Sequence, residues 1–475
     1  MNKIAFTPKL VRICCLSLIS IFTLSGVSAQ TPAMEQDAVT VDKIFDQALT
    51  NGRCYPWLER LCFDVGHRLS GSPAAEKAVL WAKSVLDTLP LDSVWLQPCM
   101  VPHWVRGQAE EVRMLGKTKK EFVPLAALAL GGSVGTSPGG IQAEVVEVKS
   151  WEALDQLGER NIRGKIVFYN RPMDPTKIRT FEAYGGCVDQ RVSGASKAAK
   201  YGAVAVLVRS MTLRLDDFPH TGSLRYDSAF TLIPAAAIST QAAELLSKTI
   251  KEQKTVQVSI KMNCQMLADA PSNNVIGEIR GSQYPNTYIT VGGHLDSWDV
   301  GHGAHDDGAG VVQSFDALRL LQQIGYQPRH SIRCVAFMNE ENGLRGGKAY
   351  ADEAKRKRET HLFAIESDAG GFTPRGFSFE SEHHSFEKIY EKIKSMESLF
   401  TPYGLVFAKG GSGADISPLR PFKAVLSGYA PDSQRYFDYH HTADDTFDKV
   451  NKRELELGAA CMAALIYLVD KYGME

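Results

Sequence analysis

The chain has 475 residues, of which 44% are hydrophobic and 23% charged, and its formal net charge at pH 7 is −1. This composition is typical of a globular protein and excludes a disordered or membrane-embedded chain. Basic residues form no stripe along the sequence, so nothing in it points to nucleic acid or to an anionic membrane surface. The length predicts two or three domains.

The first 29 residues have the pattern of a cleaved secretory signal. Basic residues precede an apolar run over residues 13–24, and Val27-Ser28-Ala29 supplies the small residues that a signal peptidase accepts. The alternative, an uncleaved membrane anchor, needs about 20 apolar residues, and this run is shorter. We therefore expect cleavage after Ala29, a secreted or periplasmic protein, and no stable membrane insertion.

Residues 30–130 are predicted to form the N-terminal, mostly helical part of the main domain. Apolar residues recur at three- and four-residue spacing over 41–49 and 74–86, which indicates two helices. Ser72-Pro73 is a typical start for the second helix. The glycine-rich segment 131–140 breaks the helical pattern and marks a boundary.

Seven cysteines follow the signal segment, and no two of them form a C-x-x-C pair. Their odd number and scattered positions favour neither a zinc ribbon nor a disulfide scaffold. Export would permit disulfides, and the sequence leaves open a bond between Cys54 and Cys62. Most of these side chains are expected to be buried as small apolar groups.

Residues 131–265 are predicted to form a compact α+β module inserted into the main domain. Helical pieces separate short β-type runs, which lie at 143–148, 165–169, 203–208 and 256–260. The segment contains no sequence cluster of metal-ligand residue types. We therefore expect it to have a structural or access-controlling role, without a catalytic role of its own.

Residues 266–475 alternate strand and helix, which predicts an α/β fold with a mostly parallel sheet and helices on both faces. The predicted strands lie at 287–291, 331–338, 362–365 and 424–426. Helices are predicted at 310–324 and 452–472. In such sheets, ligands bind at the carboxyl ends of the strands.

A set of metal-ligand residue types follows these predicted strand ends. In chain order they are His294, Asp306, Glu341, Asp368 and His441. Nitrogen and oxygen ligands without sulfur suit zinc, with manganese or cobalt as alternatives. His294 and Asp368 would hold one ion, and Glu341 and His441 the other. Asp306 lies among glycines and alanines and is the natural bridge, so we expect two Zn²⁺ ions per chain.

Two acidic residues that lie close in sequence to metal ligands would complete the chemistry. Two ions about 3.5–4 Å apart would lower the pKa of a shared water toward neutrality. Glu340 has no metal in this assignment and is the candidate general base, which takes the proton of the water and delivers it to a leaving amine. Asp296 lies two residues beyond His294 on an extended segment and is expected to accept the second imidazole N–H.

These motifs resemble the carboxypeptidase Q family, also called plasma glutamate carboxypeptidase, of the di-zinc aminopeptidase superfamily. The similar stretches are Gly293-His-Leu-Asp-Ser-Trp-Asp-Val-Gly, Glu366-Ser-Asp-Ala-Gly and His440-His441. The resemblance extends over almost the whole mature chain, including Arg68-Leu-Ser-Gly-Ser. Within the middle module, Gly164–Asn170 and Pro219–Gly222 are similar to the family's protease-associated domain.

The resemblance implies zinc at the five ligands, Glu340 as base, and a cis peptide bond between Asp306 and Asp307. It also implies a homodimer that hydrolyses dipeptides or short peptides with a free N-terminus. Many superfamily members have a tyrosine just before the last histidine ligand, where this chain has His440. We therefore assign His440 as an oxyanion or substrate contact.

Two other functions remain open at this point. A glutaminyl-cyclase-like acyltransferase has the same fold but keeps a single zinc, so a metal-to-protein ratio near one would favour it. A non-catalytic, receptor-like binding protein would be expected to have lost metal ligands. This chain has lost none of them.

Overall fold

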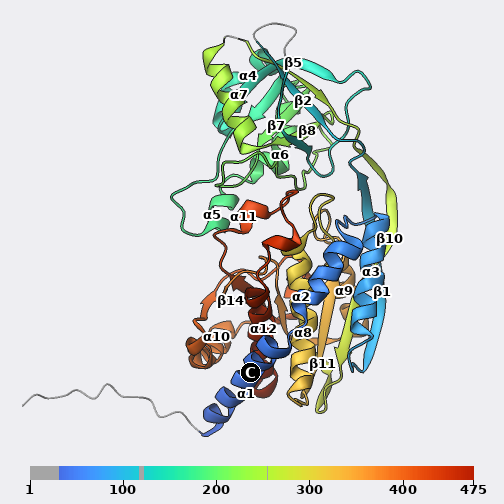
Figure 1. Cartoon of the computed structure of the whole chain (residues 1–475), viewed down its shortest axis with the longest axis vertical. Helices are drawn as coiled ribbons and strands as arrows, with labels where there is room; N and C mark the ends of the chain where they lie inside the picture. The colour runs from blue at the N-terminus through green and yellow to red at the C-terminus, as the bar shows by residue number, and fades with distance from the viewer. Residues whose placement is uncertain (1–31, 117–121, 254, 475) are drawn as a thin grey trace, which may run out of the picture.

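Two eight-stranded sheets organise this computed structural model, one above the other in Figure 1. The structure describes residues 32–116, 122–253 and 255–474. The predicted signal, residues 1–29, lies outside these ranges. Within them, no helix has both the length and the apolar character needed to cross a bilayer.

The first sheet carries the predicted strands of the C-terminal part. In spatial order its strands are β1 (Ser93–Val105), β10 (Gln265–Ile279), β12 (His330–Phe337), β11 (Tyr284–His294), β13 (Thr360–Glu366), β16 (Val425–Pro431), β14 (Pro374–Glu380) and β15 (Val406–Lys409). The central strands β12, β11, β13 and β16 are parallel, and β10 and β14 pair antiparallel on either side. The predicted parallel sheet is confirmed at its centre, while the flanks are antiparallel.

Helices cover both faces of this sheet, as predicted. One face packs against α1 (Pro32–Asn51), α2 (Cys54–Arg60), α3 (Pro73–Leu86), α8 (Ala309–Gln323) and α12 (Lys452–Tyr472). The other face packs against α9 (Arg345–Lys357) and the short helix η5 (Ser417–Phe422). Because both faces are covered, every residue of β12 is buried. The predicted helix start is also present, since the Ser72 hydroxyl accepts the Ala75 N–H.

The second sheet contains the middle of the chain. Its strands in spatial order are β3 (Phe122–Pro124), β2 (Glu111–Leu115), β9 (Gln257–Lys261), β5 (Ile141–Val148), β6 (Ile166–Tyr169), β7 (Ala205–Arg209), β8 (Ala235–Ile238) and β4 (Ala127–Ala129). It is accompanied by helices α4 (Trp151–Ile162), α6 (Asp189–Ala199) and α7 (Thr240–Glu252). The strands and helices predicted for this segment are all present.

The expectation of a mostly helical segment over residues 30–130 is correct as far as α3 and wrong beyond it. β1 forms an edge of the first sheet, whereas β2, β3 and β4 pair within the second sheet. β1, β2 and β4 gain partners from β10, β9 and β8, which follow more than a hundred residues later, and β3 pairs with β2, so the local pattern did not reveal these strands. Strand pairing therefore starts the second sheet at Glu111, ahead of the boundary predicted at residue 131.

The cysteines of the described residues form no cross-links. All seven cysteines among the described residues are buried and free. Cys54 and Cys62 therefore form no disulfide, and the expectation that most cysteines are buried is confirmed.

Aromatic side chains join the two sheets near the end of the first one. The short helices α5 (Thr180–Gly185) and α11 (Tyr436–Tyr439) lie between the sheets in Figure 1. Phe181 and Tyr184 of α5 contact Phe437 of α11, with ring centroids 4.9 and 4.7 Å apart. This packing brings the second sheet over the carboxyl ends of β11, β12 and β13.

Candidate metal centre

The five predicted metal ligands meet at the carboxyl edge of the first sheet. His294 is the last residue of β11, Glu341 follows β12, and Asp368 follows β13. The three strands are parallel neighbours, so their ends bring these side chains together. Asp306 lies in η2 (Ala304–Gly308), directly before α8, and His441 follows α11.

Asp306 lies between two groups of ligands. Its Oδ1 is 3.1 Å from Nε2 of His294, and that nitrogen is 3.4 Å from Oδ1 of Asp368. Its Oδ2 is 3.3 Å from Nε2 of His441, which in turn is 3.1 Å from Oε2 of Glu341. The structure thus brings the five side chains together in two groups that share one carboxylate.

The residues present fit divalent cations. Two buried carboxylate oxygens, Oδ2 of Asp306 and Oε1 of Glu341, have no hydrogen-bond partner among the described residues. A buried acceptor without a partner is unfavourable, and a bound cation would satisfy it. A donor set of imidazole and carboxylate without sulfur suits zinc.

The electrostatics of the cluster agree with this fit. Burial, together with nearby carboxylates, raises the pKa of Glu340 to about 8 and that of Glu341 well above its ordinary value. Burial also tends to raise the pKa of Asp306, but the hydrogen bond with His294 and the neighbouring histidines hold it well below its ordinary value. Burial lowers the pKa of His441, which keeps its imidazole neutral and able to bind a metal.

The backbone around Asp306 is held by two other carboxylates. The peptide bond between Asp306 and Asp307 is cis, as the family resemblance implied. The Asp307 carboxylate accepts the N–H of His294 at 2.9 Å and that of Gly310 at 3.0 Å. Asp445 accepts the N–H of Asp306 at 3.1 Å. Gly310 has to be a glycine, because a Cβ atom there would clash with the carbonyl oxygen of Ser367.

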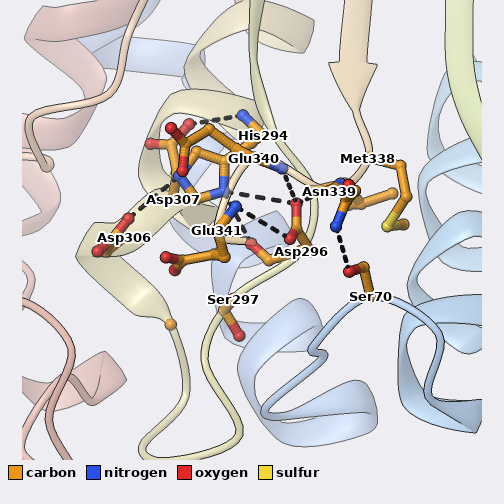
Figure 2. A network of polar contacts seen from close by, with 12 residues as sticks. Ser70, His294, Asp296, Ser297, Asp306, Asp307, Met338, Asn339, Glu340 and Glu341 are labelled. Atoms are coloured by element: carbon orange, nitrogen blue, oxygen red, sulfur yellow. Dashed lines mark hydrogen bonds and ion pairs between the residues drawn. The ribbon is translucent and has the colours of Figure 1, made fainter. Parts of the chain in front are cut away.

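Asp296 has a different role from the one expected from the sequence. Nδ1 of His294 lies 2.9 Å from the backbone carbonyl oxygen of Asp296, whereas the nearer carboxylate oxygen is 3.8 Å away. The carboxylate instead accepts the N–H groups of Asn339, Glu340 and Glu341 at 2.7, 3.0 and 3.4 Å (Figure 2). Asp296 therefore fixes the backbone that carries Glu340 and Glu341.

Replacing Asp296 by alanine should lower the free energy of unfolding by about 2–4 kcal/mol, because each buried N–H left without an acceptor costs about 1–3 kcal/mol. Urea unfolding of the metal-free protein measures this loss. Asp64→Ala is the control: Asp64 forms an exposed pair with Arg60, and such pairs contribute at most about 1 kcal/mol. Equal stability of the two variants would rule out this role of Asp296.

Arg68 is a positioning residue. The search for metal-ligand and catalytic residue types did not select it, although it lies in the stretch Arg68-Leu-Ser-Gly-Ser that resembles the family. Its side chain is fully buried. The guanidinium donates to the carbonyl oxygens of Leu295, His302 and Gly303 at 2.6, 2.7 and 2.9 Å. It therefore holds the loop between β11 and η2, and with it Asp306.

The middle module also contacts the ligands, through the loop between β7 and β8. The Thr221 carbonyl oxygen lies 3.2 Å from Nδ1 of His441, and the Thr221 N–H donates to the His441 carbonyl oxygen at 3.1 Å. The Ser223 hydroxyl donates to the backbone carbonyl oxygen of Glu341 at 2.7 Å. The middle module therefore orients two of the ligands, a role for which its sequence contains no metal-type signal.

Two cavities meet at the cluster. One of about 590 Å³ is lined by Asp306, Glu340 and His440, among others. A second, of about 1000 Å³, shares Phe181, Leu344 and Asp368 with the first. There is thus room for peptide residues on both sides of the ligands.

His440 lies beside the shared carboxylate. Its ring stacks on that of His441 with centroids 3.5 Å apart, and its Nε2 is 3.8 Å from Oδ2 of Asp306. Burial lowers the pKa of His440 to about 4, so the ring is neutral near pH 7. Its assignment as an oxyanion or substrate contact stays a prediction.

Comparisons with known proteins place these features in context. The model of peptidase family M28 matches residues 274–466. Carboxypeptidase Q of Bos taurus is 35% identical over 418 residues, 88% of this chain and 85% of its own length. Carboxypeptidase Q of Homo sapiens is 33% identical over 456 residues, 96% of this chain and 93% of its own length.

Solved structures show the same similarity. The crystal structure of a peptidase M28 precursor from Shewanella amazonensis SB2B superposes with a TM-score of 0.87 at 32% identity, covering 93% of this chain and 98% of that one. A zinc aminopeptidase from Bacillus subtilis shares the fold at 20% identity, with a TM-score of 0.63 over 89% of this chain and 96% of its own.

Proposed function

Because this chain belongs to peptidase family M28, together with carboxypeptidase Q, and is thus a metallopeptidase, we propose that it hydrolyses dipeptides or short peptides with a free N-terminus. One observation carries the proposal: the two oxygens of Asp306 face two different ligand groups. A carboxylate in this position can hold two ions on either side of one water.

In this proposal two Zn²⁺ ions share Asp306. His294 and Asp368 would complete the shell of one ion, and Glu341 and His441 that of the other. When bound, the ions would lower the pKa of a water and polarise the carbonyl of the scissile bond. The partnerless oxygens of Asp306 and Glu341 both lie in the second group, which supports a second ion there.

Glu340 is the proposed general base. It lines the same cavity as Asp306 and Asp368, and Asp296 holds its backbone through the Glu340 N–H. Its carboxylate would take the proton of the attacking water and then deliver it to the leaving amine. Burial and neighbouring carboxylates raise the pKa of Glu340 in the metal-free site. Bound cations would favour the ionised form, which is the form that can accept the proton of the water.

Two alternatives fit the site less well. A single-zinc acyltransferase of the glutaminyl-cyclase type would need ligands for one ion only, whereas this site has ligands for two. A receptor-like binding protein would have no use for Glu340, which lines the cavity beside the ligands. The complete double set of ligands favours hydrolysis over both.

Substrates with a free N-terminus should be hydrolysed about 100-fold faster, as kcat/KM, than their N-acetylated forms, because the acetyl group removes the charge that the carboxylates of this cavity can bind. A dipeptide library with free and blocked amines, followed by chromatography, measures the ratio. The metal content is determined on the same protein. Equal rates for blocked substrates, or full activity with one metal per chain, would contradict the proposal.

Export and self-association complete the proposal. The pattern of residues 1–29 supports a secreted or periplasmic location after cleavage at Ala29. The resemblance to carboxypeptidase Q supports a homodimer. Short peptides outside the cytoplasm would then be the substrates.

A further inference from the structure

An arginine of the second sheet reaches the cavity above the metal ligands. Arg191 lies in α6 and lines the same cavity as Glu340 and His441. Its side chain is buried, with the residue only 7% exposed. Its Nε and Nη1 atoms have no hydrogen-bond partner among the described residues. A guanidinium in this state has unused donors at the reaction site.

Two other arginines of the described chain whose side chains are largely buried have carboxylate partners. Arg106 pairs with Asp299 and Glu110, and Arg333 pairs with Glu278 and Glu359. No carboxylate of the described chain lies within ion-pair distance of Arg191. Its guanidinium carbon lies 5.6 Å from the ring centroid of Tyr184. A buried cation without a counter-charge is unfavourable, and a carboxylate from a ligand would provide both the charge and the acceptors.

Arg191 is also close to the metal ligands. A Cβ atom at Gly222 would clash with Nη1 of Arg191 and would lie only 2.7 Å from Nδ1 of His441. The two side chains therefore pack against the same backbone position, which only a glycine leaves free. Gly222 has a φ of +131°, a conformation that also favours glycine.

Nη1 of Arg191 and Nδ1 of His441 both lie within 2.7 Å of the same Cβ position at Gly222, so the two groups are about one amino-acid residue apart. In a dipeptide, the C-terminal carboxylate belongs to the residue that follows the scissile bond, and consecutive Cα atoms are about 3.8 Å apart. A cation beside a metal ligand can therefore reach the carboxylate of a dipeptide. The carboxylate of a longer peptide would lie beyond it.

Further positive charge lines the same cavity. Arg225 and Lys348 also line it, and both side chains are exposed. The acidic groups of the cavity, Asp306, Glu340, Glu341 and Asp368, belong to the metal cluster. These exposed basic residues would attract an anionic group into the cavity that Arg191 lines.

We infer that Arg191 binds the C-terminal carboxylate of the substrate and thereby selects dipeptides over longer peptides. The inference rests on the proposed function and names a residue that determines specificity within it. It also gives the middle module a direct part in substrate recognition, beyond the structural or access-controlling role expected from its sequence.

The first test compares a dipeptide with its C-terminal amide. In the unaltered enzyme, kcat/KM for the acid should exceed that for the amide by about 100-fold, the effect of a desolvated charge pair. In Arg191→Gln the acid should lose this advantage, while hydrolysis of the amide persists. Arg191→Lys should restore part of the preference, since a lysine keeps the charge but not the planar pair of donors. Arg163→Gln, an exposed arginine after α4, is the matched control.

The second test measures binding without catalysis. In a Glu340→Gln background, calorimetry should show tighter binding of the acid than of the amide, and adding Arg191→Gln should abolish the difference. An equal loss for acid and amide would overturn the inference, because it would show that Arg191 only supports His441. An unchanged acid preference in Arg191→Gln would overturn it as well. Failure of the proposed function would appear separately, as continued hydrolysis by Glu340→Gln alone.

Discussion

Replacing Glu340 by glutamine should lower kcat by about 10²- to 10⁴-fold, the usual contribution of a general base. Glutamine keeps the shape of the side chain but cannot take a proton from water. The loss should appear in kcat more than in KM, because the proton transfer occurs in the transition state. Steady-state kinetics on a free dipeptide measures both constants.

The metal content decides how this result is interpreted. Zinc bound by Glu340→Gln should equal that of the unaltered enzyme, since Glu340 is not a ligand in the proposed site. Glu387→Gln provides a matched control, because the Glu387 side chain is 80% exposed and distant in sequence from the ligands. A variant with normal zinc and normal kcat would refute the assigned role of Glu340.

Replacing Asp306 by asparagine should remove both ions. Asp306 faces both ligand groups, with Oδ1 near His294 and Oδ2 near His441. An amide offers one neutral oxygen in place of two charged ones and cannot bridge two cations in the same way. Elemental analysis should therefore find little zinc in this variant, and peptide hydrolysis should be lost.

Variants on either side of the bridge provide the comparison. Asp368→Asn should weaken mainly the ion shared with His294, and Glu341→Gln mainly the ion shared with His441. Each should retain about one zinc per chain under conditions in which Asp306→Asn retains none. If all three variants lost zinc equally, the ligands would form one undivided site, and the bridging role of Asp306 would be wrong.

The sequence by itself determined the central sheet and the residues at its edge. Alternating strands and helices after residue 266 indicate parallel strands, and parallel neighbours end at the same edge. His294, Glu341 and Asp368 therefore come together as a consequence of local pattern and topology. The general rule that ligands bind at this edge predicts from the sequence alone that these three residues lie together.

Only the tertiary structure decided which groups hold these residues in place. The Asp296 carboxylate accepts N–H groups more than forty residues away. The sequence had instead predicted that it accepts the imidazole N–H of His294, two residues before it. Arg68 bonds to carbonyl groups more than two hundred residues away. The roles of Asp296 and Arg68 depend on which backbone groups lack a hydrogen-bond partner in the folded chain. The spacing of residues in the sequence does not predict these groups.

The same limit applies to the part of the site that comes from the second sheet. Thr221 and Ser223 contact the metal ligands, and Arg191 enters the cavity, because α5 and α11 pack the two sheets together. The segments involved are far apart in the chain, and each has an ordinary local pattern. The proposed role of Arg191 depends on its burial beside a metal ligand without a counter-charge. Only the packing of the folded chain produces that arrangement.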